Sequence, residues 1–298
     1  MRPLFLSIPL CTCLVMLSSS LSPVAAIQDS TGAQPETERP TPEGQKLKTN
    51  ETKRPNKSRP SLRDRMLNNA SNGLFGYQER RYEQMAGFKK WVQMLERENT
   101  PIEQQISHAR TKTTFTGRNK IRIPRNFNQR QLSEKGKGLD CSRTSRVQCK
   151  REKWDKFIQE QKKRLVAGAP IKQVLDAVNL YMNNTPYIVD PSNWGVPDYW
   201  ATTTEFFYKD GDCEDYAISK YVTLKRIGFD TKNMRLVIGQ DNNSRVEHAI
   251  LAVKLEAMEY ILDNQVDNVL PHTKIRHFTP VYAINEHAWW RHSRKKNY

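Results

Sequence analysis

The sequence predicts an α+β fold, with helices first and an antiparallel sheet after them. Apolar residues recur at helical spacing in several segments between residues 85 and 227. Three β-rich runs, "MRLVIG", "EHAILAVKL" and "EYILDN", follow and are divided by turn residues. Helices that precede a group of consecutive strands are typical of an α+β domain.

The first 26 residues are typical of a secretory signal peptide. Arg2 supplies a minimal basic start, and the apolar stretch after it is too short to span a membrane comfortably. Val24 and Ala26 occupy the small-residue positions before a cleavage site. A retained membrane anchor is the alternative, and no cysteine ends the apolar run as a lipoprotein would require. We therefore expect cleavage after Ala26 and export.

Residues 27–72 are predicted to form a disordered basic linker. They are rich in Pro, Thr, Lys and Glu and lack apolar periodicity. The chain carries a net charge of +16, and this segment could bind an anionic surface such as a membrane or nucleic acid. A solubilising tether is the simpler interpretation. No nucleic-acid-binding signature accompanies the basic residues, so no nucleic-acid partner is expected.

The ordered domain is expected over residues 73–298 and begins with amphipathic helices. Two of them are predicted in "KWDKFIQEQKK" and "PIKQVLDAVNLYMNN", with Pro170 in the first turn of the second. Residues 101–150 are polar and basic and are expected to form a variable insertion. An earlier segment has apolar residues at helical spacing and should present one core face, made by Met85, Phe88, Trp91, Val92 and Leu95.

Three cysteines remain once the signal peptide, with Cys11 and Cys13, is removed. Export implies an oxidising compartment, in which two of the three can pair. Cys141 and Cys149 lie close together in a polar segment and are the natural pair, so a disulfide should staple the insertion. Cys213 is then the odd thiol.

A segment rich in Pro, Gly, Asn and Trp, "PYIVDPSNWGVPDYWATTTEFFYKDG", precedes this thiol. It is predicted to be an ordered loop, because its aromatic side chains require burial. Trp194, Tyr199 and Trp200 are expected to pack in the core, with a place in an oxyanion hole or cleft as the alternative. Glu205 is expected to be a solvated charge. Near the C-terminus, the residues expected in the core or cleft wall are His287 and Trp290.

A helix is predicted to begin at or near Cys213 and to end before Gly228. The positive end of a helix favours a thiolate and offers N–H donors to an oxyanion. Three carboxylates, Asp212, Glu214 and Asp215, flank the thiol. They suit the helix end, and they could also turn outward and bind a cation. An inert buried thiol remains the alternative for Cys213.

A base and an orienting group for this thiol lie in the predicted sheet. His248 lies in "EHAILAVKL" and Asp263 ends "YILDN", and a tight turn at "EAMEY" would set these strands antiparallel and the two residues side by side. The order Cys–His–Asp is that of a papain-like hydrolase. A structural histidine is the alternative. Zinc is less suited than calcium to the hard acids.

An EF-hand is excluded for "DGDCED". A calcium loop of that type requires glycine at its sixth position and glutamate at its twelfth. Here those positions hold Asp215 and Tyr221.

Four segments, "DGDCEDYAISKYVTLKRIGF", "HAILAV", "YILDN" and "YAINEHAWWRH", resemble the bacterial transglutaminase-like cysteine proteinases, and among them the periplasmic LapG-type proteases. The resemblance covers about residues 74 to 292 and is weak across 101–150. It implies a papain/transglutaminase-like fold, in which a nucleophile helix packs on an antiparallel sheet. It also implies Cys213 as nucleophile, His248 as base and Asp263 as orienting residue. Calcium is implied at acids that match Asp212 and Glu214, with Asp215 nearby.

The same resemblance implies a biological role. Such proteases cleave the N-terminal region of large surface adhesins at a di-alanine site, and the periplasmic domain of an inner-membrane cyclic-di-GMP receptor sequesters them. We therefore expect a periplasmic, calcium-dependent cysteine endopeptidase that controls biofilm. The long linker and the cysteine-bearing insertion depart from the family pattern. The alternatives are a transglutaminase or amidase with the same triad, a non-catalytic calcium-binding envelope protein, and a tether that acts through the basic tail.

Overall fold

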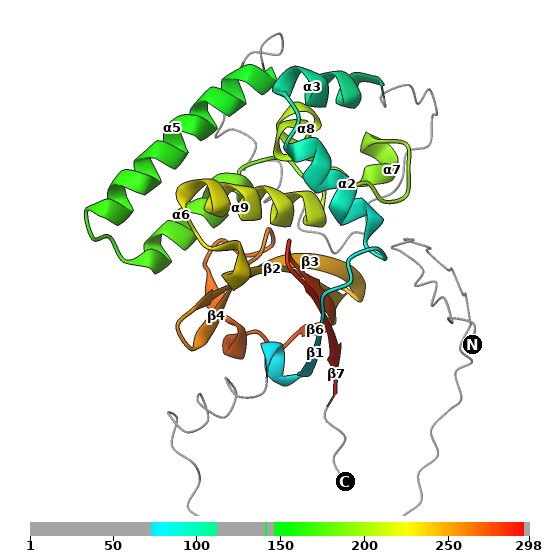
Figure 1. Ribbon diagram of the computed structural model, residues 1–298, viewed down its shortest axis with the longest axis vertical. Coiled ribbons are helices and arrows are strands. Elements are labelled where there is room, and N and C mark those ends of the chain that lie inside the picture. Colours follow the sequence, from blue (N-terminus) through cyan, green and yellow to red (C-terminus); the bar gives the residue numbers. More distant parts are fainter. Residues whose placement is uncertain (1–72, 112–140, 142–145, 295–298) are drawn as a thin grey trace, which may run out of the picture. The chain divides into compact units, whose positions relative to one another are not determined.

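The computed structural model describes residues 73–111, 141 and 146–294 (Figure 1). The predicted signal peptide, the linker and most of the expected insertion lie outside this part. The described α-helices are α2 (Lys89–Glu98), α3 (Ile102–Thr111), α5 (Arg146–Val166), α6 (Ile171–Asn183), α7 (Asp190–Asn193), α8 (Thr203–Lys209) and α9 (Cys213–Ile227). None of them is long and apolar enough to cross a membrane.

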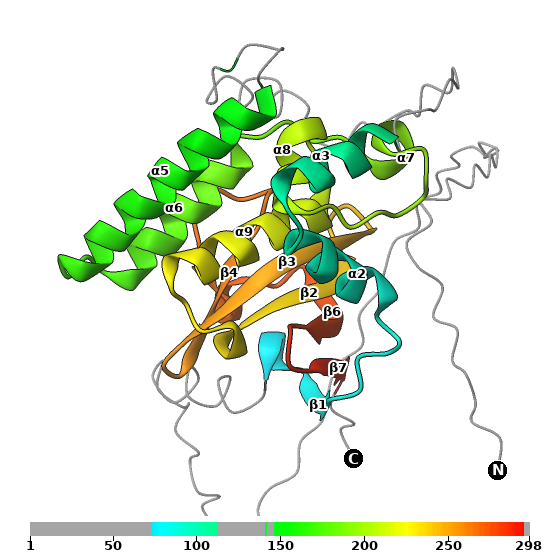
Figure 2. The ribbon, with the colours of Figure 1, turned by 45° about the horizontal axis from the view of Figure 1, so that its top comes forward.

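A seven-stranded sheet accompanies the helices, with β1 before them in the chain and the other six strands after them, and all of its neighbouring strands are antiparallel. Its order is β1-β7-β6-β2-β3-β4-β5. The strands are β1 (Gln78–Tyr82), β2 (Met234–Asp241), β3 (Val246–Leu255), β4 (Met258–Leu262), β5 (Leu270–Pro271), β6 (Phe278–Ile284) and β7 (Trp289–Ser293). The α-helices lie over one side of the sheet in both ribbon views (Figures 1 and 2), so the predicted α+β fold is confirmed.

Alternation along the central strands divides the core between the two faces of the sheet. Leu236 and Leu251 point to the helical side and join a core with Trp91, Trp154 and Tyr221. The residues next to them in sequence, Val237, Ile250 and Ala252, point to the other face and belong to a second cluster. This cluster includes part of the 3₁₀ helix η1 (Leu74–Gly76), and its members are Leu74, Val237, Ile250, Ala252, Ile261, Phe278 and Ala283. The sheet is therefore buried on both faces around β2 and β3, and β3 carries the predicted base, His248.

The predicted helix at Cys213 is confirmed, and its surroundings in the core explain its position. It begins at Cys213 and ends before Gly228, whose φ of 121° is a conformation that favours glycine. Most of its residues are buried, since it lies between the sheet and helices α5, α6 and α8. α9 is therefore the central helix of the domain.

Other boundaries differ from the prediction. The helix expected at Met85–Leu95 starts only at Lys89, and Met94 is buried on its core face while Val92 is only partly buried. Pro170 is the N-cap of α6 instead of lying in its first turn. The polar segment 101–150 contains α3, which is anchored by buried Gln105 and Ala109.

The segment expected to be one ordered loop contains two short helices, α7 and α8. Thr202 accepts a hydrogen bond from the backbone N–H of Glu205, and the Glu205 carboxylate accepts one from the backbone N–H of Thr202. This reciprocal pair is a capping box, which is recognisable as Thr-x-x-Glu in the sequence. The expected loop is therefore interrupted by a helix start whose sequence signal is this Thr-x-x-Glu pattern rather than the aromatic composition.

Candidate active site

Cys213 is the first residue of α9 and is partly exposed. Its Sγ donates a hydrogen bond to Glu214 Oε2 at 3.1 Å. It also accepts one from the backbone N–H of Ala249, the residue after His248 on β3. The thiol thus lies against the strand that carries the predicted base.

His248 and Asp263 lie side by side, as the predicted hairpin required. His248 Nε2 and Asp263 Oδ1 are 2.8 Å apart, and the pair is buried. β3 and β4 pair from Leu255↔Met258 to Leu251↔Leu262, so Asp263 directly follows the last paired residue of β4. The backbone N–H of Gln265 donates to the same carboxylate oxygen at 2.9 Å.

The charge of Asp263 is stabilised by these contacts. Burial alone would raise the pKa of this carboxyl, but the charge and hydrogen bond of His248, with the Gln265 N–H, outweigh burial and hold the pKa below its usual value. An ionised Asp263 fixes the His248 proton on Nε2 and leaves Nδ1 as the basic nitrogen.

Cys213 and His248 line the same cavity, whose volume is about 310 Å³. Apolar walls come from Trp200, Ile238, Val281 and Tyr282, and the charged lining residues are Asp198, Glu214, Arg245 and Glu247. An apolar cleft with a few charged groups and a thiol beside a histidine is suited to nucleophilic attack on a bound carbonyl group.

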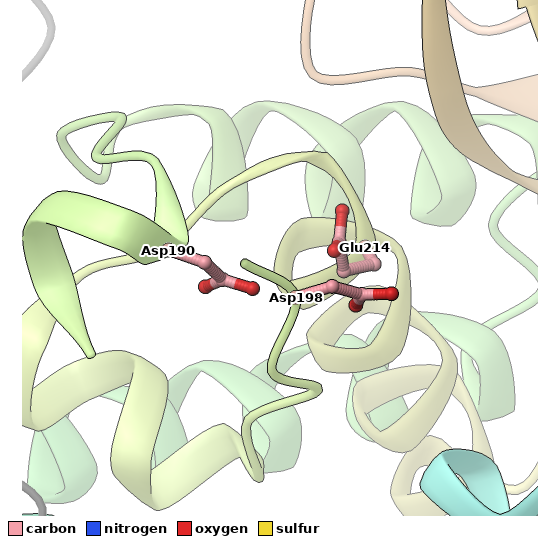
Figure 3. A group of neighbouring side chains, drawn as sticks. All are labelled: Asp190, Asp198 and Glu214. Carbon is pink, nitrogen blue, oxygen red and sulfur yellow. The ribbon is translucent and has the colours of Figure 1, made fainter. Parts of the chain in front are cut away.

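Five buried or nearly buried carboxylates gather beside the thiol. Asp190, Asp198 and Glu214 come from three segments: α7, the loop before α8, and the first turn of α9 (Figure 3). A second group consists of Asp190, Asp212 and Asp215. In each group, one oxygen per residue lies within 4.8 Å of the others. The predicted acids are thus joined by Asp190 and Asp198, which sequence reasoning missed.

Burial and mutual repulsion both act on the carboxylate cluster (Asp190, Asp198, Asp212, Glu214 and Asp215). Burial first, and then the charges of Glu214 and Asp198, raise the pKa of Asp190 to about 8. Burial and neighbouring acids also raise the pKa values of Asp212, Glu214 and Asp215. Lys90 forms an ion pair with Asp198, which compensates part of the negative charge.

Several oxygens of the cluster have no hydrogen-bond partner among the described residues: Asp190 Oδ1, Asp198 Oδ1, Asp212 Oδ1 and Asp215 Oδ2. Buried unpaired oxygens of this kind are costly unless a cation binds them. Hard carboxylate oxygens are what calcium prefers. The donor set therefore fits a calcium ion, held by residues of the carboxylate cluster.

The electrostatics at Cys213 differ from the thiolate expected at a helix start. Burial, followed by the charges of Glu214 and Asp212, raises the pKa of the Cys213 thiol well above its usual value. Burial and the neighbouring acids together outweigh the partial positive charge of the helix end.

Other predicted residues have clear positions. Trp200 lines the cavity, whereas Trp194 and Tyr199 pack together away from it. The expectation of a solvated Glu205 was wrong: it is completely buried and bound to Tyr199, His108 and Arg97. A capping carboxylate with a buried partner network is not free to reach solvent.

The two residues near the C-terminus lie outside the cavity. His287 is exposed and hydrogen-bonded to Thr231, so its placement in the core or cleft wall was wrong. Trp290 is partly buried beside the second core cluster and covers Arg235, in agreement with a core position.

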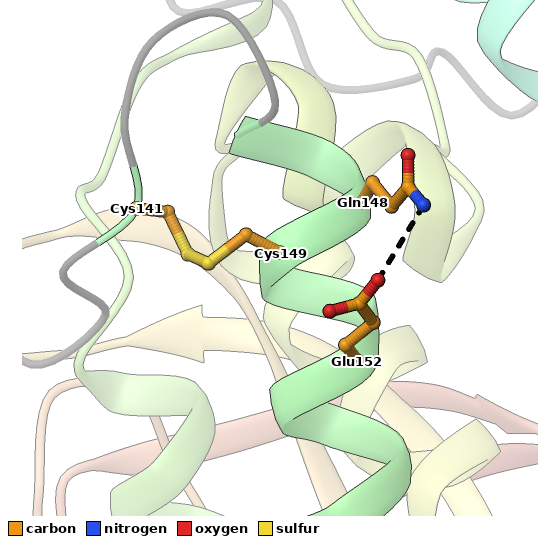
Figure 4. Close-up of a disulfide and its surroundings, with 4 residues drawn as sticks. All are labelled: Cys141, Gln148, Cys149 and Glu152. Carbon is orange, nitrogen blue, oxygen red and sulfur yellow. Dashed lines mark hydrogen bonds between the residues drawn. A yellow bond between two sulfur atoms is a disulfide. The ribbon is translucent and has the colours of Figure 1, made fainter.

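Cys141 and Cys149 form the expected disulfide (Figure 4). Among the described residues, Cys213 is the free cysteine. Cys149 lies in the first turn of α5, where Gln148 also donates to Glu152. The disulfide therefore attaches Cys141 to the first turn of the long helix α5.

The chain was compared with known protein sequences and with solved structures. No curated protein sequence matches it. Solved structures similar to it include Legionella pneumophila LapG, with 24% identity, a TM-score of 0.44, and coverage of 64% of this chain and 88% of that one. A calcium-bound form of that protein has a TM-score of 0.43, and an EGTA-treated form has 0.44, both at 24% identity. The calcium-bound form covers 64% of this chain and 88% of its own, and the EGTA-treated form 64% and 86%.

The sequence model of one family matches residues 141–296, more than half of the chain. The matched region contains Cys213, His248 and Asp263, and its fold is the α+β arrangement described above. The chain therefore belongs to the bacterial transglutaminase-like cysteine proteinase family, as its sequence motifs predicted.

Proposed function

We propose that this cysteine proteinase is an exported, calcium-dependent endopeptidase that uses Cys213, His248 and Asp263 as its catalytic triad. One observation carries the proposal: Cys213 and His248 line one cavity, and Asp263 binds Nε2 of His248. The other ring nitrogen, Nδ1, is thus left to act as the base. The family supplies the reaction class, which is hydrolysis of a peptide bond by a cysteine nucleophile.

In the proposed reaction, His248 Nδ1 accepts the proton of the Cys213 thiol as Sγ attacks the carbonyl carbon of the substrate. The imidazolium then returns the proton to the leaving amine, and an acyl-enzyme remains on Cys213. Asp263 accepts the Nε2–H hydrogen bond and stabilises the imidazolium. Water, activated by His248, releases the acyl group and restores the thiol.

Calcium is proposed as the resident cation, with Asp190, Asp212, Glu214 and Asp215 as ligands and Asp198 as a further candidate. Its support is the set of buried unpaired oxygens and the raised pKa values of these carboxyls. When bound, the ion supplies positive charge that offsets the acids beside the thiol. Asp212 and Glu214 would then oppose ionisation of Cys213 less strongly.

The proposed substrate is the N-terminal region of a large surface adhesin, cleaved in the periplasm. The proposed regulator is the periplasmic domain of an inner-membrane cyclic-di-GMP receptor. Both proposals rest on the motif resemblance that also indicated the family. The apolar walls at Trp200, Ile238 and Val281 are compatible with small apolar side chains next to the cleaved bond.

Incubation with N-terminal adhesin fragments from the same organism tests the proposal. Wild-type protein with calcium is compared with Cys213→Ala, and products are identified by mass spectrometry. We expect discrete cleavage by the wild type and none by the variant, with equal melting temperatures. Cleavage by Cys213→Ala would contradict the mechanism. Products joined to an added primary amine, with no hydrolysis, would instead indicate acyl transfer.

A further inference from the structure

The loop that leads to the nucleophile is held by the first turns of α5. Asp210 is the residue after α8 and lies three positions before Cys213. Arg146 Nη2 donates to both of its carboxylate oxygens, at 2.9 and 2.7 Å, and Lys150 Nζ donates to Oδ1 at 2.7 Å. The side chains of Asp210 and Lys150 are only 4% and 3% exposed. Two cations thus bind one buried carboxylate.

The backbone of Asp210 has a conformation that ordinarily favours glycine. Its φ is 67° and its ψ is −170°, a region that side chains with a Cβ rarely adopt. Strained residues of this kind persist only where their surroundings hold them. The carboxylate and its two cations are therefore a specific reason for aspartate at a glycine-like position.

Hydrogen bonds also fix both peptide groups around Asp210. Its N–H donates to Phe206 O at 2.8 Å, and its C=O accepts from Asn193 Nδ2 at 3.0 Å. The next carbonyl, that of Gly211, accepts from the N–H of Ile188 at 2.9 Å. Relaxation of the loop at these points would break one or more of these hydrogen bonds.

Gly211 packs directly against the first turn of α9. A Cβ at this position would lie 2.2 Å from Asp215 Oδ2 and 2.7 Å from Asp215 Cβ. A shift of the Asp210 backbone would therefore be transmitted to Asp215 and to Cys213, which share that turn.

We propose that Asp210, held by Arg146 and Lys150, is a positioning residue that sets the location of Cys213 relative to His248. This inference rests on the proposed function of Cys213 and His248. It gives a role in catalysis to α5, a helix that carries no residue of the triad. The Asp210 clamp (Asp210, Arg146 and Lys150) acts through the backbone of residues 210–213, since none of its three residues lines the cavity that holds Cys213 and His248.

The clamp is tested by the reactivity of Cys213 and by steady-state kinetics, with calcium present. Asp210→Asn removes the charge and keeps the strained backbone, and Asp210→Gly removes the charge and relieves the strain. We expect both variants to lower the rate constant for alkylation of Cys213 by iodoacetamide, and kcat, by about tenfold or more with little change in KM, since small misplacements of reacting groups are costly. Arg146→Lys should retain most of the activity and Arg146→Met should not.

Two controls separate positioning from general stability. Lys156→Met changes an exposed lysine on the same helix. Arg235→Met breaks a buried ion pair elsewhere, since Arg235 bridges Glu79 and Glu259 at 2.9 and 2.6 Å. Arg235→Met should lower the melting temperature without slowing alkylation of Cys213, measured well below that temperature.

Unchanged rates of alkylation and unchanged kcat in Asp210→Gly would overturn the proposal. Glycine adopts the backbone conformation of residue 210 without strain, so this variant removes the carboxylate and still allows the native fold. Loss of both rates in Arg235→Met, to the same extent as in Asp210→Asn, would also overturn it. The alkylation measurement needs no substrate. A protein that cleaves no adhesin fragment would contradict the proposed function, while its alkylation rates would still decide the role of Asp210.

Discussion

Cys213 is a thiol surrounded by groups that oppose its ionisation and by one that promotes it. Burial, and then the charges of Glu214 and Asp212, raise its pKa, while a hydrogen bond from the backbone N–H of Ala249 lowers it. The same carboxylates are the candidate calcium ligands. The nucleophile and the candidate metal site would therefore be coupled by charge, because a cation that satisfies the acids would also lower the cost of a thiolate.

A second histidine, His292, has a consequence for acid stability. It lies on β7, is 7% exposed, and neither ring nitrogen has a hydrogen-bond partner among the described residues. Burial, offset in part by Glu79 and reinforced by Arg235, lowers its pKa from 6.5 to about 4. His292 is therefore neutral in the folded protein where it is charged in the unfolded chain.

The first prediction concerns this difference. Between pH 6.5 and about 4 the unfolded chain binds a proton that the folded protein does not, so stability falls as pH falls through this window. The loss attributable to His292 is on the order of 3 kcal/mol. Urea unfolding at a series of pH values should show a shallower acid decline in His292→Leu than in the wild type.

Exposed His287 provides the matched control for this prediction. His287→Leu should decline with acid as the wild type does. An equal acid decline in the wild type and in both variants would show that His292 does not carry the effect.

At the level of single residues, the sequence predicted what local patterns encode. His248 and Asp263 were predictable because a tight turn fixes the register of two adjacent strands. Asp190 and Asp198 were not, because they reach the cluster through an irregular segment whose path no periodicity describes. Two acids inside an aromatic-rich loop, where burial is expected, were the available signal.

Among the elements, those with a strong apolar pattern were predicted best. α9, β2 and β3 were located because they are long and mostly buried, and β4 because a tight turn joins it to β3. β1 and β7 pair with each other at one end of the sheet, and their exposed polar residues obscured the strand pattern. Tertiary pairing of the two ends of the domain, rather than local propensity, places them in the sheet.

The second prediction concerns α5 and its disulfide. The Cys141–Cys149 bond closes a short loop next to Lys150 of the Asp210 clamp. The Cys141→Ser/Cys149→Ser variant should lose about 2–3 kcal/mol of unfolding free energy, because its unfolded chain is less constrained. Chemical denaturation measures the loss, and non-reducing peptide mapping checks the bond in the wild type.

The free thiol gives this experiment its control. Cys213→Ala should keep the disulfide and the unfolding free energy of the wild type. Peptide mapping that finds Cys141 and Cys149 unpaired, or either of them joined to Cys213, would contradict the assignment.

In the domain as a whole, the site forms where three separate parts of the chain meet. α7 and the loop after it bring Asp190 and Asp198, the start of α9 brings Cys213, and the β3–β4 hairpin brings His248 and Asp263. In Figure 2, α7 and α8 lie above the sheet near the start of α9. A cation held by Asp190 together with Asp212, Glu214 or Asp215 would therefore link α7 to the start of α9, where the nucleophile lies.

The last prediction follows from that arrangement. Calcium should raise the melting temperature, because it binds the folded state: an excess of 100 times the dissociation constant adds about 2.7 kcal/mol. Chelator should abolish cleavage, added calcium should restore it, and magnesium should restore it poorly, since its small octahedral shell suits such clusters badly. Asp190→Asn and Asp212→Asn should weaken calcium binding in calorimetric titrations, whereas Glu160→Gln, an exposed change on α5, should not. No calcium binding by the wild type, together with full cleavage in chelator, would leave the five carboxylates without a metal and the cost of their burial unexplained.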